Sequence, residues 1–313
     1  NDWNNTLGDP NDPTIPTYNA YDNIFRTGIT HDASVSASGG NEDTKFFISG
    51  NYFNQEGIQV GQGFERISGR LNLDKSVNDK FGIGTSILLS RTNHERTINE
   101  NDEYGVVINA QAWDPTAPLI QPDGSYTNPF NYYGWWALEN PLLIAQEYTN
   151  TSNTNRVLAS IYGEYAITDK LSFKSSWSLD YNELIDESFI PAGFNQTDEG
   201  IGVYGTYLEL AWLSENTLTY DFSINQDHNF NVLAGFTLQE STQEFSSITG
   251  TGYPVNTVIK TSAAANSSGT SNGSAFGFVS FIGRLNYNYK DKYLANFTVR
   301  SDGSSRFGEE NRS

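Results

Sequence analysis

Apolar and polar residues alternate one by one along much of this chain. In one segment the apolar positions are Leu171, Phe173, Trp177, Leu179 and Tyr181, and the polar positions between them are Ser172, Lys174, Ser176, Ser178 and Asp180. Successive side chains of a β-strand point to opposite faces, so this segment has one apolar and one hydrophilic face. The pattern predicts strands that separate an apolar from a polar environment.

The same alternation predicts about ten strands and an all-β fold. They lie at 29–38, 44–54, 65–76, 81–92, 154–167, 171–184, 206–224, 229–245, 276–289 and 293–301. Most are as long as the roughly 9–11 residues that a tilted strand needs to cross a bilayer.

Short and long connections alternate between these strands. The short ones are 39–43, 77–80, 168–170, 225–228 and 290–292; the long ones are 55–64, 93–153, 185–205 and 246–275. A transmembrane up-and-down barrel has short periplasmic turns and long extracellular loops. A soluble β-sandwich also alternates apolar and polar residues, but it has no reason to keep this order of connections.

We therefore predict a transmembrane antiparallel up-and-down β-barrel. Residues 28–313 are its strands, with 93–153, 185–205 and 246–275 as the long extracellular loops, and residues 1–27 are a lead-in segment. Aromatic residues flank the short turns, as an interfacial girdle requires. They are Phe222 with Phe230, Tyr287 and Tyr289 with Tyr293, and Tyr165 with Phe173. The alternative reading of these aromatics is that they cap a soluble core.

Composition narrows the class of protein further. The 313 residues include no Cys, which excludes a disulfide-stapled domain and a Cys-ligated metal site. The net charge of −19 argues against nucleic acid and against a basic surface for anionic lipids. Mean hydropathy is −0.51, without an apolar run of the roughly 18 residues of a transmembrane helix. The chain has no Met and no signal-peptide pattern after Asn1, so we expect a piece of a longer or processed protein.

Several motifs resemble one family, the SusC-like TonB-dependent transporters. The first is the turn Ser38-Gly39-Gly40, followed by a strand that ends with Tyr52, Gln55, Gly57 and Ile58. The second is the strand motif made by Arg70, Asn72 and Asp74, with Arg66 before it. The third and most specific is 289–312, which is similar to a conserved family segment except that Ser301 replaces a common Arg.

The resemblance implies a 22-stranded barrel in the outer membrane of a Gram-negative bacterium, of which about ten strands are present here. It also implies an N-terminal plug that contacts TonB, which lies outside this chain, and a SusD-like surface lipoprotein as a lid. The implied function is import of glycan- or peptide-type nutrients. Two alternatives remain: a non-transporting SusC-like scaffold of an outer-membrane assembly or secretion complex, and a soluble β-sandwich adhesin or glycan-binding module.

Candidate contact residues fall into two groups. The aromatic residues of loop 93–153 suit contact with substrate or lid, or else pack into the loop's own core; the candidates are Trp113, Tyr132, Tyr133, Trp135 and Trp136. Basic residues opposite the apolar sets are expected to face the lumen and pair with the plug; they are Arg66, Arg70, Arg156, Lys174 and Arg284.

We expect no enzyme activity, because no G-x-S-x-G, H-E-x-x-H or phosphate-loop motif is present. His31, His94 and His228 lie on separate segments, so we expect no metal site and no cofactor. A weaker expectation is Ca²⁺ at the oxygen-rich segment Asn99–Glu103, which lacks EF-hand spacing and also suits a solvated loop tip.

Overall fold

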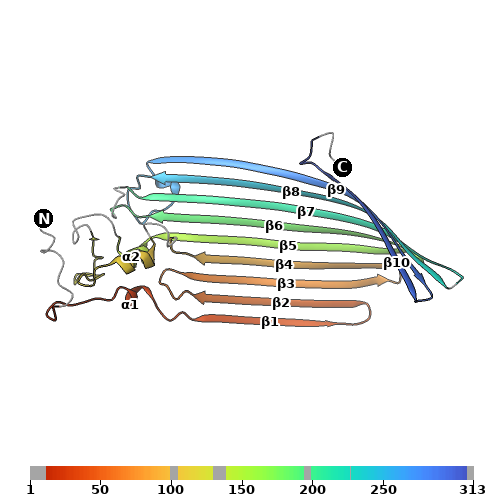
Figure 1. Cartoon of the computed structure of the whole chain (residues 1–313), viewed down its shortest axis with the longest axis horizontal. Helices are drawn as coiled ribbons and strands as arrows, with labels where there is room; N and C mark the ends of the chain where they lie inside the picture. Colours follow the sequence, from red (N-terminus) through yellow and green to blue (C-terminus); the bar gives the residue numbers. More distant parts are fainter. Residues whose placement is uncertain (1–11, 99–104, 130–138, 194–198, 226, 309–313) are drawn as a thin grey trace.

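Ten antiparallel strands form one sheet in chain order, each pairing with the next (Figure 1). The computed structural model describes residues 12–98, 105–129, 139–193, 199–225 and 227–308. The strands are β1 (Thr30–Gly40), β2 (Thr44–Glu56), β3 (Gly63–Asn78), β4 (Phe81–Glu95), β5 (Thr149–Thr168), β6 (Leu171–Ile190), β7 (Ile201–Ile224), β8 (His228–Thr251), β9 (Asn266–Tyr289) and β10 (Tyr293–Ser304). This single layer confirms the predicted up-and-down topology. The β-sandwich alternative is wrong, because the described strands form no second sheet that covers the first.

All tight turns lie at one end of the sheet, opposite the helices (Figure 1). The β9–β10 turn shows why so few residues suffice. Lys290 and Asp291 both have left-handed backbone conformations, with φ of 50° and 51°, as the two central residues of a type I′ turn do. The Lys292 amide donates to the Tyr289 carbonyl at 3.0 Å and closes the turn.

The middle strands are longer than predicted, so the long connections are shorter. β7, β8 and β9 each have 24 residues, and the connections beside them shrink to 191–200 and 252–265. The residues at 266–275 read as a loop because they are Ser, Gly, Thr, Asn and Ala without apolar alternation. They are strand nonetheless, since ladder hydrogen bonds join backbone groups whatever the side chain.

The buried apolar core lies in the connection from β4 to β5, together with the segment before β1. The described residues there form three short helices: α1 (Tyr21–Ile24), α2 (Val106–Ala112) and α4 (Pro141–Glu147). Ile24, Val106 and Leu143 are all almost fully buried in this core, which we call the loop core. The sequence did not predict these helices, because one or two turns are too short to show a helical period. In the described part of the chain, no helix is long and apolar enough to span a membrane.

Candidate functional site

The strand register puts the predicted apolar residues on one face of the sheet. Ile161 lies opposite Trp177 in the β5–β6 ladder, and Phe236 lies opposite Phe281 in the β8–β9 ladder. Ile161, Trp177 and Phe281 are 58%, 52% and 58% exposed. Such a continuous exposed apolar surface is typical of a face that contacts something apolar. We call it the apolar face and its opposite the polar face.

The apolar residues of this face form a band across the strands, which we call the apolar band. The band runs obliquely to the rows of paired residues. At the turn end, the band begins on β4 with Phe81, the first residue of that strand. Residues that lie side by side across β5, β6 and β7 connect Phe81 to Ala234, which is already six residues after the start of β8. At the other end, the band gives way to polar residues at Arg91 on β4. The residue of β8 at the same level as Arg91 is Glu244, but on β8 the polar residues begin earlier, at Glu240. Both edges shift in the same direction, as the tilted strands of a closed barrel require.

Aromatic rings stack beside the tight turns of β7 to β10. Phe222 and Phe230 stack at 4.9 Å between ring centroids, and Phe230 contacts Tyr287 at the same distance. His228 lies 4.7 Å from Tyr289, and Tyr289 stacks on Tyr293 at 6.3 Å. The rings form a continuous row, the arrangement predicted for a girdle at a membrane interface.

The polar face carries almost all basic side chains of the strands. Among the described strands, only Lys75 and Arg91 lie on the apolar face, Lys75 near the turn end of β3 and Arg91 near the other end of β4. The five predicted basic residues share the polar face; they are Arg66, Arg70, Arg156, Lys174 and Arg284. The structure therefore gives them one common orientation, while the plug contact remains a prediction.

Arg156 is the most tightly held of these residues. Its Nε and Nη2 donate to the two carboxylate oxygens of Asp180 at 3.1 and 2.9 Å, a bidentate pair between β5 and β6. The pair is about half exposed, so its contribution to stability is modest. Its greater effect is to fix the position of a guanidinium on the polar face.

Lys174 lies over an aromatic ring rather than beside a carboxylate. Its Nζ is 4.4 Å from the centroid of the Tyr162 ring, and the Tyr162 hydroxyl donates to Asp74 at 2.7 Å. Gly84 lies under Tyr162, and a Cβ there would collide with the ring and with Asp74. These three side chains thus connect strands β6, β5 and β3 in addition to the backbone hydrogen bonds of the sheet.

Arg66, Arg70 and Arg284 have weaker partners. Arg66 lies 5.7 Å from the Phe53 ring centroid and donates to Asn51 at 3.4 Å. Arg70 borders a shallow hollow of about 430 Å³ whose floor includes Leu88 and Leu158. Within the described residues, neither Arg70 nor Arg284 forms an ion pair, so both keep charges available for an anionic partner.

A further polar centre on this face escaped the sequence analysis. Glu209 on β7 accepts hydrogen bonds from Tyr207 at 3.2 Å, Gln243 at 3.1 Å and Ser241 at 3.5 Å. The signal was present, since these residues occupy polar positions of predicted strands. Their partnership depends on the β7–β8 register, which puts Glu209 opposite Gln243.

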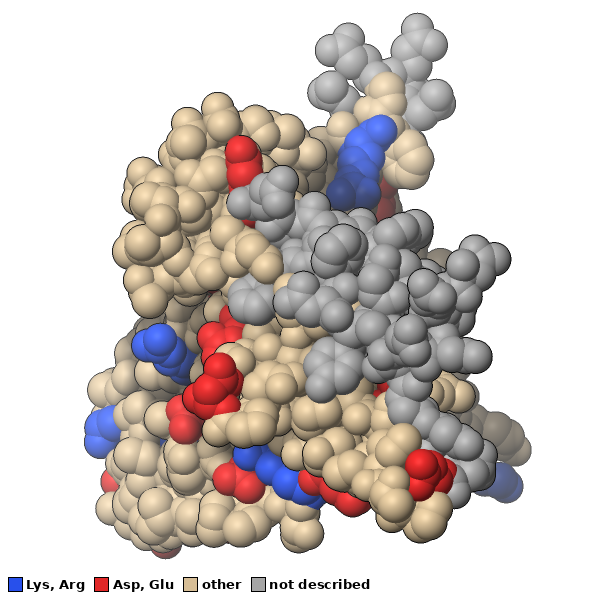
Figure 2. Space-filling model, turned by 90° about the vertical axis from the view of Figure 1, so that its left-hand side faces the viewer, with Lys and Arg blue, Asp and Glu red and all other residues tan. Residues whose placement is uncertain are grey.

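At the outer end, opposite the tight turns, one arginine connects three segments. Arg96 Nη2 donates to Asp186 at 2.9 Å and to Asn150 at 3.2 Å, just after β4 ends. Thr97 next to it accepts from Gln59 and Gln62 of the β2–β3 connection. Figure 2 looks onto this end, where acidic and basic side chains lie close together in its lower part.

Trp113 is a core residue of the β4–β5 connection. It is 6% exposed, and its Nε1 donates to the Ala117 carbonyl at 2.9 Å. This position matches the packing alternative rather than an exposed contact. The other aromatic candidates lie outside the described residues; they are Tyr132, Tyr133, Trp135 and Trp136.

Two adjacent residues organise the loop core. Asn140 caps α4 by accepting from the amides of Leu142 and Leu143, and its Nδ2 donates to the Leu119 and Thr127 carbonyls. Glu139 is 2% exposed, and its Oε2 has no hydrogen-bond partner among the described residues. Burial raises the pKa of Glu139 to about 7.

The described residues include no group of three or more potential metal ligands. His31, His94 and His228 lie on β1, β4 and β8, and His228 Nδ1 is 2.6 Å from the Tyr287 hydroxyl. The whole segment Asn99–Glu103, where Ca²⁺ was a weak expectation, lies outside the described residues, so that expectation stays a prediction.

Comparison with known proteins identifies the family. TonB-dependent receptor P26 of Formosa agariphila is 33% identical over 313 residues, covering 97% of this chain. SusC, a TonB-dependent receptor of Bacteroides thetaiotaomicron, is 24% identical over 336 residues, covering 93% of the chain. The chain belongs to the SusC-like TonB-dependent receptors. No family model matches it. It spans 31% of the length of the Formosa relative and 30% of SusC.

The solved structures give the same fold. The RagAB peptide transporter superposes with a TM-score of 0.80 at 21% identity, covering 95% of this chain and 35% of the matched chain. The ten strands are thus a partial barrel of a SusC-like receptor, and the open edges at β1 and β10 are those of a part of a larger sheet. TonB-dependent receptors are outer-membrane proteins of Gram-negative bacteria.

Proposed function

We propose that the protein to which this chain belongs imports glycan- or peptide-type nutrients across the outer membrane, driven by TonB. The observation that carries the proposal is the division of the sheet into two faces. Exposed Ile, Trp and Phe side chains occupy one face and nearly all strand cations the other, as lipid and an aqueous lumen require.

The relatives support the nutrient class without naming the substrate. The structural match is described as a peptide transporter, and SusC is a TonB-dependent receptor. On the polar face, the exposed charges of Arg70 and Arg284 and the amide and carboxylate groups around Glu209 suit a hydrated ligand or a polar plug surface.

The proposal includes a SusD-like lipoprotein at the outer end. Hydrogen bonds that hold the segments of this end together support the proposed lid. Arg96 joins two strands to the β4–β5 connection, and Asn256 exchanges two hydrogen bonds with Ala192 between neighbouring connections. An ordered rim offers a fixed surface for a lid to close against.

Uptake by whole cells tests the proposal. A strain that lacks the full-length gene should fail to grow on one glycan or peptide source, and the full-length gene should restore growth. The same gene without its TonB-contacting segment is the matched control and should not restore growth. The scaffold alternative predicts the opposite: growth is unaffected on every source, while assembly or secretion of another outer-membrane protein fails.

A further inference from the structure

The connection from β8 to β9, residues 252–265, packs back onto the strands that it joins and onto their neighbours. Tyr253 near its start is 7% exposed, and its ring meets Phe189 of β6 edge-on, with 4.9 Å between the ring centroids. Near its end, the short 3₁₀ helix η1 (Thr261–Ala263) lies against β8 and β7. We call this connection the strap, because both of its ends are fastened to the sheet.

Two glycines make room for the Tyr253 ring. Gly202 of β7 and Gly250 of β8 lie opposite each other in the ladder. A Cβ at Gly202 would collide with the Tyr253 hydroxyl, and a Cβ at Gly250 would lie only 2.8 Å from the same oxygen. The ring thus occupies the space that side chains at these two positions would fill. Phe189 lies beside it, opposite Gly202 in the β6–β7 ladder.

Polar contacts hold the middle of the strap. Asn256 Oδ1 accepts from the Ala192 amide at 2.8 Å, and Asn256 Nδ2 donates to the Ala192 carbonyl at 3.1 Å. Lys260 Nζ lies 2.6 Å from Glu187 Oε1, but the Lys260 side chain is 65% exposed, so this ion pair adds little. The buried Tyr253 ring is therefore the main anchor. We call these contacts together the clasp.

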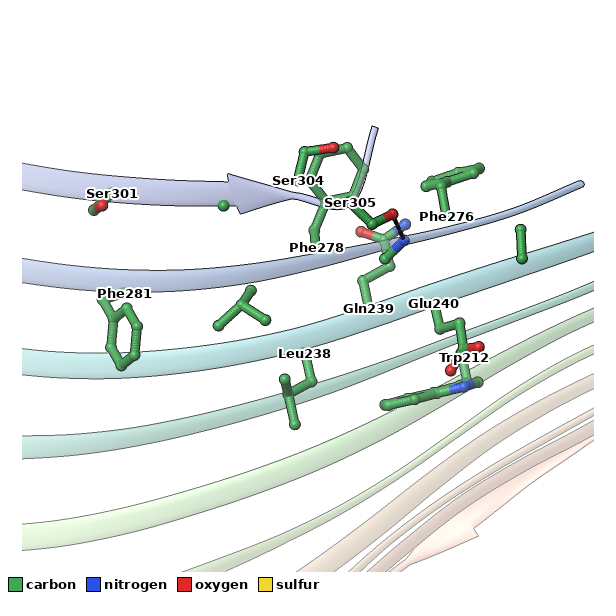
Figure 3. A pocket seen from close by; sticks show the side chains of 14 residues that line it. Trp212, Leu238, Gln239, Glu240, Phe276, Phe278, Phe281, Ser301, Ser304 and Ser305 are labelled. Carbon is green, nitrogen blue, oxygen red and sulfur yellow. Dashed lines mark hydrogen bonds between the residues drawn. The ribbon is translucent and has the colours of Figure 1, made fainter. Parts of the chain in front are cut away.

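The clasped strap lies on the side of the sheet that carries the apolar face. Gly202, under the Tyr253 ring, is ten residues from Trp212 on β7, and an even spacing keeps two residues on the same face of a strand. Figure 3 shows Trp212 on one side of the ribbons and Phe276 and Phe278 of the polar face on the other. The strap is thus folded away from the polar face.

We propose that the clasp is a conformational device that keeps the strap off the mouth of the barrel. The inference rests on the proposed function, in which the polar face lines the path of the nutrient. The strap lies between Thr251 and Asn266 on neighbouring strands, so a released strap can reach outward by half its length. Half of the strap is about seven residues, which extend roughly 23 Å. A released strap can therefore cover the polar face beside β8.

Trypsin cleavage tests the clasp in the full-length protein in outer-membrane vesicles. Lys260 is the only Lys or Arg of the strap, and cleavage follows the released population when release and reclosing are fast. Tyr253→Ala should raise the rate of cleavage after Lys260 about a hundredfold, as expected for the loss of a buried aromatic side chain. Tyr253→Phe should keep the wild-type rate, because the hydroxyl has no hydrogen-bond partner among the described residues.

Gly202→Ala opens the same clasp from the strand. Its new methyl group displaces the Tyr253 hydroxyl, so cleavage after Lys260 should rise here too. Gly205→Ala on the same strand is the matched control, since the nearest atom to a new Cβ is the Ser246 carbonyl oxygen at 3.8 Å. Heat-modifiability shows for each variant that the barrel is folded. Wild-type cleavage rates in both Tyr253→Ala and Gly202→Ala would overturn the proposal.

Cysteine labelling on the polar face tests the effect on the mouth. Ser247 of β8 lies opposite Gly205 on the polar face, near the outer end of the strand. A membrane-impermeant biotin maleimide added to intact cells should label Ser247→Cys, and adding Tyr253→Ala should slow this labelling several-fold. Equal or faster labelling, together with faster cleavage after Lys260, would mean that the clasp exists but does not control the mouth, and the proposal fails.

A third outcome concerns the proposed function itself. If Ser247→Cys stays unlabelled in both backgrounds, the polar face is not reached from the medium, and the proposed import path fails together with the role of the strap. Cleavage after Lys260 still reports on the clasp in that case, so the two failures are distinguishable.

Discussion

Ile161 and Trp177 lie directly opposite each other between β5 and β6, and more than half of each side chain is exposed. One residue away on each strand, Tyr162 lies opposite Ser176 on the polar face. A single-residue step therefore changes the environment of a side chain from the apolar to the polar face. This contrast gives the first prediction.

Ile161→Arg should sharply reduce assembly of the full-length barrel, whereas Ser176→Arg should be tolerated. Arg on the lipid face at midplane costs roughly 2–4 kcal/mol, while an Arg at 176 has Glu215 opposite it on β7. The measurement is the amount of heat-modifiable folded barrel in outer-membrane fractions. Equal loss for both variants would contradict the assignment of the two faces.

Gly84→Ala should destabilise the barrel by about 1–3 kcal/mol, because the added methyl displaces the Tyr162 ring and its bond to Asp74. Gly82→Ala is the control on the same strand and face, where the nearest atom to a new Cβ is the Lys75 carbonyl oxygen at 3.8 Å. Urea unfolding of the refolded full-length protein in detergent measures both. A Gly84→Ala variant as stable as Gly82→Ala would show that Tyr162 moves aside without cost.

Asn140→Ala should loosen the loop core while the strands stay intact. It removes the cap of α4, which is worth about 0.5–2 kcal/mol, and the two hydrogen bonds that Asn140 Nδ2 donates to the Leu119 and Thr127 carbonyls. Hydrogen exchange of the α4 amides should speed up. Gln111→Ala on the exposed side of α2 should leave that exchange unchanged; faster exchange in both variants would point to a general weakness of the connection.

The loop core should become less stable as pH rises from about 4.5 to about 7. Burial raises the pKa of Glu139 from 4.5 to about 7, so in this range the unfolded segment has already lost a proton that the folded segment keeps. Stability is therefore greatest below about 4.5, falls through this window, and levels off above it. Hydrogen exchange of α4, corrected for the intrinsic rate, measures it.

Glu139→Gln should abolish this pH dependence, because the amide does not titrate. Glu147→Gln, at the exposed last residue of α4, is the control and should keep the wild-type profile. A pH profile that survives in Glu139→Gln would assign the effect to another group.

The sequence predicted the sheet well because alternation reports directly on its two faces. The alternating set in Leu171–Tyr181 and the turn at Lys290 and Asp291 both lie where we predicted. The outer ends of β8 (246–251) and β9 (266–275) were missed because they are mostly Ser, Gly, Thr and Asn without apolar alternation, although the backbone pairs throughout.

The site was less predictable, because its contacts join residues far apart in sequence. The shared face of the five basic residues follows from parity alone. The pairing of Arg156 with Asp180, of Lys174 with Tyr162, and of Glu209 with Gln243 requires the register of neighbouring strands. The burial of Trp113 required the loop core, whose helices are too short to leave a pattern.

The unexpected length of β8 has a consequence for the mouth of the barrel. From Glu240 to Thr251 the strand continues past the apolar band, about 40 Å along its own direction at about 3.4 Å per residue. β7 and β9 accompany it throughout, so this extension is a hydrogen-bonded wall rather than a set of free loops. Three neighbouring strands that stay paired over this length give the outer end of the sheet a continuous backbone ladder. The polar side chains at this end, Glu244 among them, therefore lie at positions that the strand pairing fixes.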